Sequence, residues 1–110
     1  MSRQNQIIKF QFAGFKFSWD DTKARMNKRN HGVAFEEAAS CWLDPLNVES
    51  ADPEHSLNES RWLLVGASKL NRLLICWFTE RQVNVDEVVR IIGARKVNLS
   101  ERLRYEENKQ

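Results

Sequence analysis

The chain has 110 residues, of which 42% are hydrophobic and 29% are charged. This length suits a single domain, and the composition is that of a globular protein rather than a disordered one. No apolar run approaches the roughly 18 residues that a membrane span needs, and residues 1–6 do not resemble the start of a secretory signal. We therefore expect a cytoplasmic protein that makes no membrane contact.

The net charge is only +2, but positive and negative side chains are segregated along the sequence. Residues 1–32 and 61–104 are mainly basic. All charged side chains in residues 33–60 are acidic, namely Glu36, Glu37, Asp44, Glu49, Asp52, Glu54 and Glu59. A small domain with this layout can carry a basic face that binds a polyanion and a separate acidic face. Solvated surface charge without a partner explains the pattern equally well.

Cys41 and Cys76 both lie in apolar stretches and lack the close spacing of a zinc or redox motif. We expect both to be small, buried hydrophobic residues rather than a disulfide or metal ligands.

The first predicted elements are a strand or hairpin followed by a helix. Phe10 and Phe12, and then Phe15 and Phe17, alternate with polar residues around Ala13-Gly14, which is typical of a short edge hairpin. We interpret residues 1–14 as an N-terminal extension or edge strand and residues 15–108 as one domain. Residues 18–21 offer helix-capping side chains, and the helix from residue 22 to about 31 should end at Gly32.

The clearest helical pattern lies just after Gly32. One apolar stripe is formed at helical spacing by Phe35, Ala38, Ala39, Trp42 and Leu43. We expect Glu36, Glu37 and Ser40 to lie on the opposite face of this helix, which should end at Asp44-Pro45.

The second half of the chain has the patterns of strands. We predict a short strand over 46–48, adjacent antiparallel strands over 61–66 and 72–79, and a last hairpin arm over 83–94. Residues 73–78 are apolar on both faces, as in a central strand that is covered on each side. Asn98 and Glu101 resemble the capping box of a short C-terminal helix that holds Leu99, Leu103 and Tyr105.

These elements predict an α+β fold. Two N-terminal helices would pack on a twisted antiparallel sheet of about four to five strands, with a short helix at the C-terminus.

Several polar residues lie on strands that are otherwise apolar. Glu59 and Arg61 are two residues apart, as are Thr79 and Arg81, so each pair shares one face of its strand. If the three last strands form a simple meander, Arg61, Thr79 or Arg81, and Arg95 converge near one end of the sheet. One guanidinium group can donate two parallel hydrogen bonds to phosphate oxygens, so this pattern favours a phosphodiester ligand. Exposed strand-end charges that keep the edges soluble remain the alternative.

The two histidines give weaker signals. His31 shares a helix face with Lys23 and Asn27, and it is either a catalytic group or a partner of the helix dipole at the C-terminal end. His55 should lie in a loop, where it is either a turn residue or a proton donor. The sequence has no paired-His or Cys spacing typical of a metal site, and we expect neither a metal nor a cofactor.

An ordered series of motifs resembles the BrnT family of ribonuclease toxins, from about Phe15 to Glu107. The early motifs are Phe17-Ser18-Trp19-Asp20-Asp21-Thr22-Lys23 and residues 27–38, which read NKRNHGVAFEEA. The later motifs are Asp44-Pro45, Asp52-Pro53-Glu54-His55-Ser56, Glu59-Ser60-Arg61-Trp62 with Gly66, Arg72-Leu73-Leu74 leading to Thr79-Glu80-Arg81, and residues 90–96 followed by Glu101-Arg102 and Tyr105.

This resemblance implies a RelE-like fold and a toxin that cleaves RNA without a metal and inhibits growth. It also implies a cognate ribbon-helix-helix antitoxin, similar to BrnA. The complex would bind DNA only through this antitoxin. A homodimer of the toxin is compatible with the resemblance. Metal-free cleavage needs a base, an acid and cations around the phosphate. The expected catalytic residues are Lys23, His31, Glu59, Arg61, Thr79 and Arg95. The expected RNA-binding residues are Arg81, Arg90 and Lys96.

Within that set, we expect Arg61 and Arg95 to hold the phosphate, with Arg81 or Lys23 placing the strand. Glu59 or His31 would act as base or acid, and Thr79 would orient it. Positioning alone can supply much of the rate.

Two features depart from the family pattern. Asn30 stands where the family commonly has Lys, and the stretch 82–89 looks longer than a tight hairpin turn. Either feature could weaken catalysis. The alternative function is therefore a catalytically weak or inactive module that binds the antitoxin and acts as its co-repressor.

Overall fold

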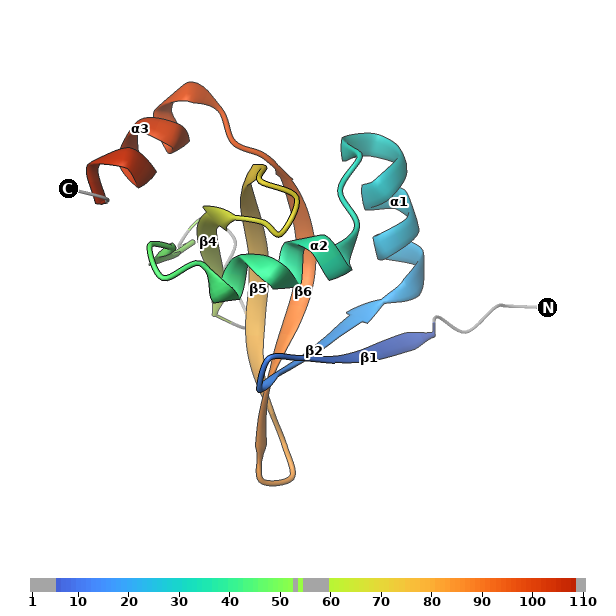
Figure 1. Cartoon of the computed structure of the whole chain (residues 1–110). Helices are drawn as coiled ribbons and strands as arrows, with labels where there is room; N and C mark the ends of the chain where they lie inside the picture. Colours follow the sequence, from blue (N-terminus) through green and yellow to red (C-terminus); the bar gives the residue numbers. More distant parts are fainter. Residues whose placement is uncertain (1–5, 53, 55–59, 109–110) are drawn as a thin grey trace.

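The structure is a computed structural model that describes residues 6–52, 54 and 60–108. The described residues form one six-stranded sheet with three α-helices and a short 3-10 helix (Figure 1). The strands are β1 (Ile7–Phe12), β2 (Phe15–Asp20), β3 (Val48–Ala51), β4 (Arg61–Ala67), β5 (Leu73–Val83) and β6 (Asp86–Lys96). The helices are α1 (Asp21–His31), α2 (Phe35–Ser40), the 3-10 helix η1 (Cys41–Leu43) and α3 (Leu99–Asn108).

The strands lie in the order β1-β2-β6-β5-β4-β3. All neighbouring pairs are antiparallel except β2 and β6, which are parallel and share the register pairs Phe17–Val89 and Ser18–Arg90. The predicted α+β class is confirmed, but the prediction of four to five antiparallel strands is wrong. The N-terminal hairpin joins the sheet and inserts β2 beside the last strand. Hydrophobic periodicity indicates a strand but not its partner, so this pairing left no signal in the sequence.

The meander of β4, β5 and β6 agrees with the prediction, whereas the expected long connection over 82–89 is wrong. Val83 pairs with Asp86, so only Asn84 and Val85 form the turn, and Asn84 has a φ of 57°. The polar residues of this stretch belong to strands that extend beyond the rest of the sheet as a two-stranded ribbon (Figure 1).

Helix α1 begins and ends close to the predicted positions. Asp20 is its N-cap, and the carboxylate of Asp20 accepts a 3.0 Å hydrogen bond from the Lys23 N–H. Gly32 ends the helix with a φ of 70°, a left-handed conformation that glycine adopts without steric cost.

Helix α2 is shorter than predicted, because the chain tightens into η1 at Cys41. Phe35, Ala38 and Ala39 are fully buried, as the apolar stripe indicated. Leu43, however, is 50% exposed. The change from α to 3-10 geometry alters the angle between successive side chains, so Leu43 no longer continues the stripe.

Glu37 was expected on the solvent face of α2 but is only 3% exposed, and Ser40 is also buried. The Glu37 carboxylate accepts hydrogen bonds from both Nε and a terminal nitrogen of Arg72 and from the Ser68 hydroxyl. Arg72 also donates to the Gly32 carbonyl. These hydrogen bonds, led by those from Arg72, hold the pKa of Glu37 below its usual value. A buried charge is tolerated here because it is fully paired.

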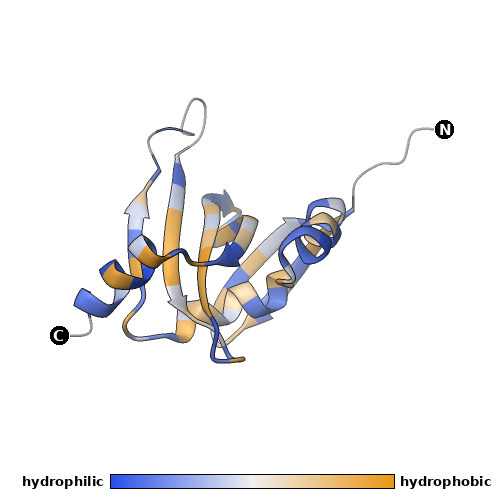
Figure 2. Cartoon of the chain, turned by 90° about the horizontal axis from the view of Figure 1, so that it is seen from above, coloured by the Kyte–Doolittle hydropathy of each residue, from blue (hydrophilic) through white to orange (hydrophobic). Residues whose placement is uncertain are grey.

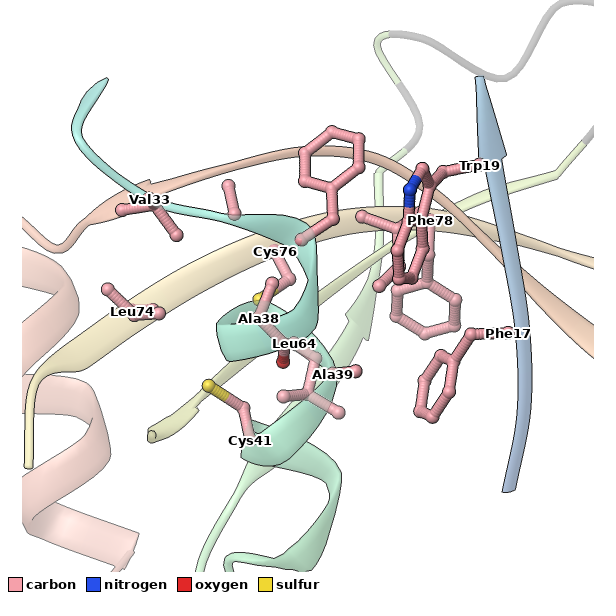
Figure 3. Close-up of a cluster of buried hydrophobic side chains, with 13 residues drawn as sticks. Phe17, Trp19, Val33, Ala38, Ala39, Cys41, Leu64, Leu74, Cys76 and Phe78 are labelled. Atoms are coloured by element: carbon pink, nitrogen blue, oxygen red, sulfur yellow. Dashed lines mark hydrogen bonds between the residues drawn. The ribbon is translucent and has the colours of Figure 1, made fainter. Parts of the chain in front are cut away.

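The sheet has two different faces. The helix face is covered by α1 and α2, and its core includes Phe17, Trp19, Leu64 and Phe78 (Figure 3). Phe35 of α2 belongs to the same core. The opposite face, which we call the open face, is covered at one end by α3. There Tyr105 packs against Val65 and Ile75 in a second, smaller cluster. The central strand β5 is thus covered on both sides at that end, as predicted.

Both cysteines are buried and free, as expected. Cys41 lies under β4, where its Sγ is 3.5 Å from the Gly66 carbonyl oxygen. A Cβ at Gly66 would stand 3.1 Å from the Cys41 carbonyl oxygen and 3.2 Å from Cβ of Asn47, so the close approach of η1 to β4 favours glycine, and a larger residue would push η1 away by a few tenths of an ångström.

Helix α3 starts with the predicted capping box. The Asn98 side chain accepts from the Glu101 N–H at 2.9 Å, and Glu101 accepts from the Asn98 N–H at 2.8 Å. Of the three residues predicted to lie on this helix, Tyr105 is buried, whereas Leu99 and Leu103 are 70% and 53% exposed. Figure 2 shows apolar residues concentrated in the strands, while α1 is largely hydrophilic. No helix in the described ranges is long and apolar enough to cross a membrane.

Candidate active site

Three polar side chains lie in one row across the open face. Arg61 of β4 is directly opposite Thr79 of β5, and Thr79 is directly opposite Arg90 of β6. Residues opposite each other on neighbouring strands project from the same face, with Cβ atoms about 5 Å apart. Two guanidinium groups therefore stand on either side of one hydroxyl. We call these three residues the arginine–threonine row.

The row is partly enclosed rather than spread over an exposed surface. Thr79 is only 2% exposed, and both arginines are half-buried. Arg90 Nε donates a 2.8 Å hydrogen bond to the Ser18 hydroxyl of β2, which fixes the direction of its side chain. The Thr79 hydroxyl is buried and has no hydrogen-bond partner among the described residues. A buried polar group without a partner is costly, and a role in catalysis is one reason why a protein keeps such a group.

Arg81 lies on the same face as the row, two residues farther along β5, where it pairs in register with Val88. It is exposed at the rim. Because both residues lie on β5, two positions apart, Arg81 is close to Thr79 on the same face, as the sequence predicted.

Arg95 lies on the same face but not in the row. It is opposite Ile75, about 13 Å from Thr79 along β5 at the usual rise of a strand. A β-bulge at Trp77–Phe78 shifts the register, and Arg90 takes the place next to Thr79 where the sequence predicted Arg95. On a regular strand, two residues five positions apart would face opposite sides, so the bulge is what places Arg90 and Arg95 on one face.

The side chain of Arg95 has its own partners. It forms two 2.9 Å hydrogen bonds with the Glu101 carboxylate, and its guanidinium carbon lies 5.1 Å from the centre of the Trp77 ring. Burial raises the pKa of Glu101, but the hydrogen bonds from Arg95 and from the Asn98 N–H outweigh it and leave that pKa below its usual value. These contacts attach α3 to the sheet.

The other predicted residues are not in the row. Lys96 pairs in register with Leu74 and therefore projects from the helix face. Lys23 and His31 are exposed on α1. Between them on the same helix face, Asn27 is buried, and its amide bonds to both the N–H and the carbonyl of Ala94. The structure thus gives Asn27 a part in attaching α1 to β6. Glu59 and His55 lie outside the described residues.

The helix face carries the opposite charge at the same end of the sheet. A groove of about 500 Å³ is lined there by Glu49, Glu80 and Glu87 together with Trp42 and other residues. A hydrogen bond to Glu87, burial and the nearby charges raise the pKa of Glu80. The basic row therefore lies on one side of the sheet and an acidic groove on the other. Of the three glutamates, only Glu49 belongs to the acidic segment 33–60, so the charge segregation along the sequence does not by itself produce the two faces.

Comparison with known proteins identifies the family. The family model described as "Ribonuclease toxin, BrnT, of type II toxin-antitoxin system" matches residues 19–101, most of the chain. The chain belongs to the BrnT family. No curated protein matches the sequence.

The fold agrees with this membership. The crystal structure of the Brucella abortus ribonuclease toxin BrnT superposes with a TM-score of 0.50 at 17% sequence identity, covering 73% of this chain and 92% of that one. The arginine–threonine row lies within residues 19–101, the segment that the family model matches, whereas most of the β1–β2 hairpin lies before this segment.

Sequence reasoning missed one residue of this site and assigned another a lesser role. Ser18 alternates with buried Phe17 and Trp19, which marks it as projecting from the other face of a strand, but its partner Arg90 is 72 residues away. Arg90 was predicted only to bind RNA. The register of β5 with β6 would have revealed its position beside Thr79, and the bulge hides that register from the sequence.

The described residues contain no group of three or more His, Cys, Asp or Glu side chains that could hold a metal ion.

Proposed function

We propose that this BrnT-family protein is an endoribonuclease toxin that cleaves RNA at the arginine–threonine row without a metal. The observation that carries the proposal is the direct opposition of Arg61, Thr79 and Arg90 on three neighbouring strands. Membership of a family of ribonuclease toxins supplies the substrate class. Two guanidinium groups on one enclosed surface supply the positive charge that a metal ion would otherwise provide.

In this mechanism, the 2′-hydroxyl of a ribose attacks the adjacent phosphorus and the 5′-oxygen of the next nucleotide leaves. Arg61 and Arg90 hold the phosphate oxygens and stabilise the charge that grows on them in the transition state. The Thr79 hydroxyl lies between the two arginines and donates a hydrogen bond to a phosphate oxygen or orients the base. Arg81, at the rim, places the neighbouring phosphate.

The proton transfers are assigned from the sequence. We propose Glu59 as the base because it lies two residues before Arg61, and a carboxylate is suited to accept the proton of the 2′-hydroxyl. His31 and Lys23 on α1 are the alternative acid and base. Replacement of each in turn, as Glu59→Gln, His31→Gln and Lys23→Gln, separates these assignments through the pH profile of cleavage.

The partner proposed for the toxin is a ribbon-helix-helix antitoxin that blocks cleavage in the cytoplasm and carries the complex to DNA. Membership of a type II toxin–antitoxin family supports an antitoxin partner. Co-expression with the product of a neighbouring gene of this type should yield a complex that binds the operon's own operator, and the toxin alone should not bind it.

The test is cleavage of RNA by the purified toxin, free of antitoxin, in the presence of EDTA. We expect discrete fragments, and a rate about 100-fold lower for Arg61→Ala or Arg90→Ala. Arg102→Ala is the matched control, because Arg102 is an exposed residue of α3 whose ion pair with Glu106, at 4.0 Å, is its only one with a described residue. Intact RNA with wild-type toxin, together with normal growth on expression, would instead indicate the non-catalytic binding module.

A further inference from the structure

The arginine–threonine row continues beyond Arg90 across two more strands. Arg90 is opposite Ser18 of β2, and Ser18 is opposite Lys9 of β1. Lys9 alternates along β1 with Ile8 and Phe10, which pack against the core of the helix face, so Lys9 projects from the open face. A single line of polar and cationic side chains therefore crosses five strands. At about 4.8 Å per strand, it extends over about 19 Å.

The Lys9 end of this line borders a groove. A cavity of about 560 Å³ lies between the β1–β2 hairpin and the β5–β6 ribbon, and it is lined among others by Lys9, Gln11, Lys16, Ser18, Val88 and Arg90. This volume falls within the range of roughly 300–1,000 Å³ found for small-ligand sites, so the groove can admit part of an extended chain such as a nucleotide. We call it the hairpin groove.

The hairpin groove has a net positive charge. Lys9, Lys16 and Arg90 are its cations, and Asp86 is the only carboxylate that lines it in the described part of the chain. Asp86 is paired with Lys16 at 2.7 Å. Lys9 is exposed and makes no ion pair with any described residue. A cation without a partner beside a groove attracts a polyanion.

We propose that the hairpin groove is an RNA-binding subsite in which Lys9 holds a phosphate next to the one bound by the arginine–threonine row. The RNA strand crosses the β-strands from Arg61 over Thr79 and Arg90 to Lys9, and Gln11 and Val88 lie against a nucleotide in the groove. This inference rests on the proposed ribonuclease function. It adds a substrate contact from the β1–β2 hairpin, most of which precedes the segment matched by the family model.

Continuity with the arginine–threonine row favours RNA over a protein ligand. Ser18 is shared by both parts, because it accepts the hydrogen bond from Arg90 and lines the groove. An anionic chain bound by the two arginines would reach Lys9 along the same line of side chains. An acidic protein segment is the alternative occupant, and the experiment below distinguishes it.

The test measures binding of a single-stranded RNA that carries 2′-O-methyl groups and therefore cannot be cleaved. The proteins are the wild type, Lys9→Ala, Lys9→Glu and the control Lys69→Ala, whose exposed lysine lies at the opposite end of β4 and β5. We expect Lys9→Ala to weaken binding several-fold and Lys9→Glu to weaken it further. The slope of log affinity against log salt should become less steep by about 0.7 for Lys9→Ala, the value for one lost phosphate contact with a single strand. Lys69→Ala should match the wild type.

The possible outcomes separate this inference from the proposed function. If the wild type binds RNA and Arg61→Ala weakens binding, but both Lys9 variants match Lys69→Ala, the hairpin groove is not an RNA subsite and the proposed function stands. If the Lys9 variants retain RNA binding but lose binding to the antitoxin, the groove is a protein site and the inference is overturned. If the wild type neither binds nor cleaves RNA, the proposed function itself fails.

Discussion

The guanidinium of Arg95 forms hydrogen bonds with both carboxylate oxygens of Glu101, each 2.9 Å long. Glu101 also caps the first turn of α3, so one carboxylate joins the end of β6 to the start of the helix. The exposed fractions of the two side chains are 32% and 21%, so water screens this pair only in part. The pair gives Arg95 a structural role that the sequence did not suggest.

Replacement of Arg95 by alanine should therefore lower stability more than catalysis. We expect Arg95→Ala to reduce the free energy of unfolding by about 1–2 kcal/mol, because it removes a charge-assisted hydrogen-bond pair and the stacking on Trp77. Denaturant unfolding measures this loss, and cleavage at a temperature where the variant is folded should be close to normal. Severe loss of cleavage with unchanged stability would instead support the sequence-based prediction that Arg95 holds the phosphate.

Replacement of Thr79 by valine tests the buried hydroxyl. Since this hydroxyl has no partner among the described residues, its removal should change the free energy of unfolding by no more than about 1 kcal/mol. Cleavage should fall at least about tenfold if the hydroxyl contacts the phosphate or orients the base. Thr79→Ser retains the hydroxyl and should keep most of the activity. Full activity in Thr79→Val would mean that the residue only fills space.

The elements of the fold could be predicted from the sequence more completely than their arrangement. The apolar run of β5, the capping box at Asn98 and the glycine that ends α1 are local signals, and the structure has each of them. Pairing between distant segments is not a local property. The position of β2 beside β6, and the bulge that brings Arg90 opposite Thr79, depend on packing that no short window of sequence contains.

Glu37 shows the same limit within a helix. Its place in the helical repeat assigned it to solvent, because the charged residue lies opposite the apolar stripe. Its partner Arg72 is 35 residues away, and only that pairing makes burial of the carboxylate favourable.

Removal of the partner should leave an uncompensated buried charge. We expect Arg72→Ala to lower the free energy of unfolding by about 3–5 kcal/mol, measured by denaturant unfolding. Arg25→Ala is the control, since Arg25 forms an exposed ion pair with Asp21 and should cost less than about 1 kcal/mol. Similar losses in both variants would contradict a special role for the buried pair.

Glu37 also predicts how stability changes in acid. Arg72 lowers the pKa of Glu37 in the folded protein, so the unfolded chain takes up the proton at a higher pH than the folded one. The stabilisation is complete above the unfolded pKa of about 4.3 and is lost as the pH falls through the lower folded pKa. The melting temperature of the wild type should therefore fall below about pH 4.3 more steeply than that of Glu37→Gln. Parallel curves would show that other groups control acid unfolding.

Tyr105 predicts a change at the alkaline end. Burial and the 2.8 Å hydrogen bond that its hydroxyl donates to Asp44 raise the pKa of Tyr105 to about 12. Because the folded pKa lies above the unfolded value of about 10, the stabilisation is complete below pH 10 and is lost as the pH rises towards 12.

The sequence contains one tyrosine, so the ultraviolet absorbance of tyrosinate reports this group alone. We expect titration well above pH 10 in the folded protein, and a loss of about 1–3 kcal/mol for Tyr105→Phe at neutral pH. This variant should also lack the wild type's extra loss of stability above pH 10. A normal titration near pH 10 would mean that the contact with Asp44 does not hold α3 in solution.

The parallel pairing of β2 with β6 has a consequence for the moment at which the toxin becomes active. Ser18 is made early and Arg90 late during synthesis, with 71 residues between them, and the hydrogen bond that joins them fixes one arginine of the row. A nascent chain that has not yet released β6 from the ribosome has neither Arg90 nor the strand on which the N-terminal hairpin docks. In the proposed mechanism, a chain that lacks β6 therefore has no complete arginine–threonine row and should not cleave RNA.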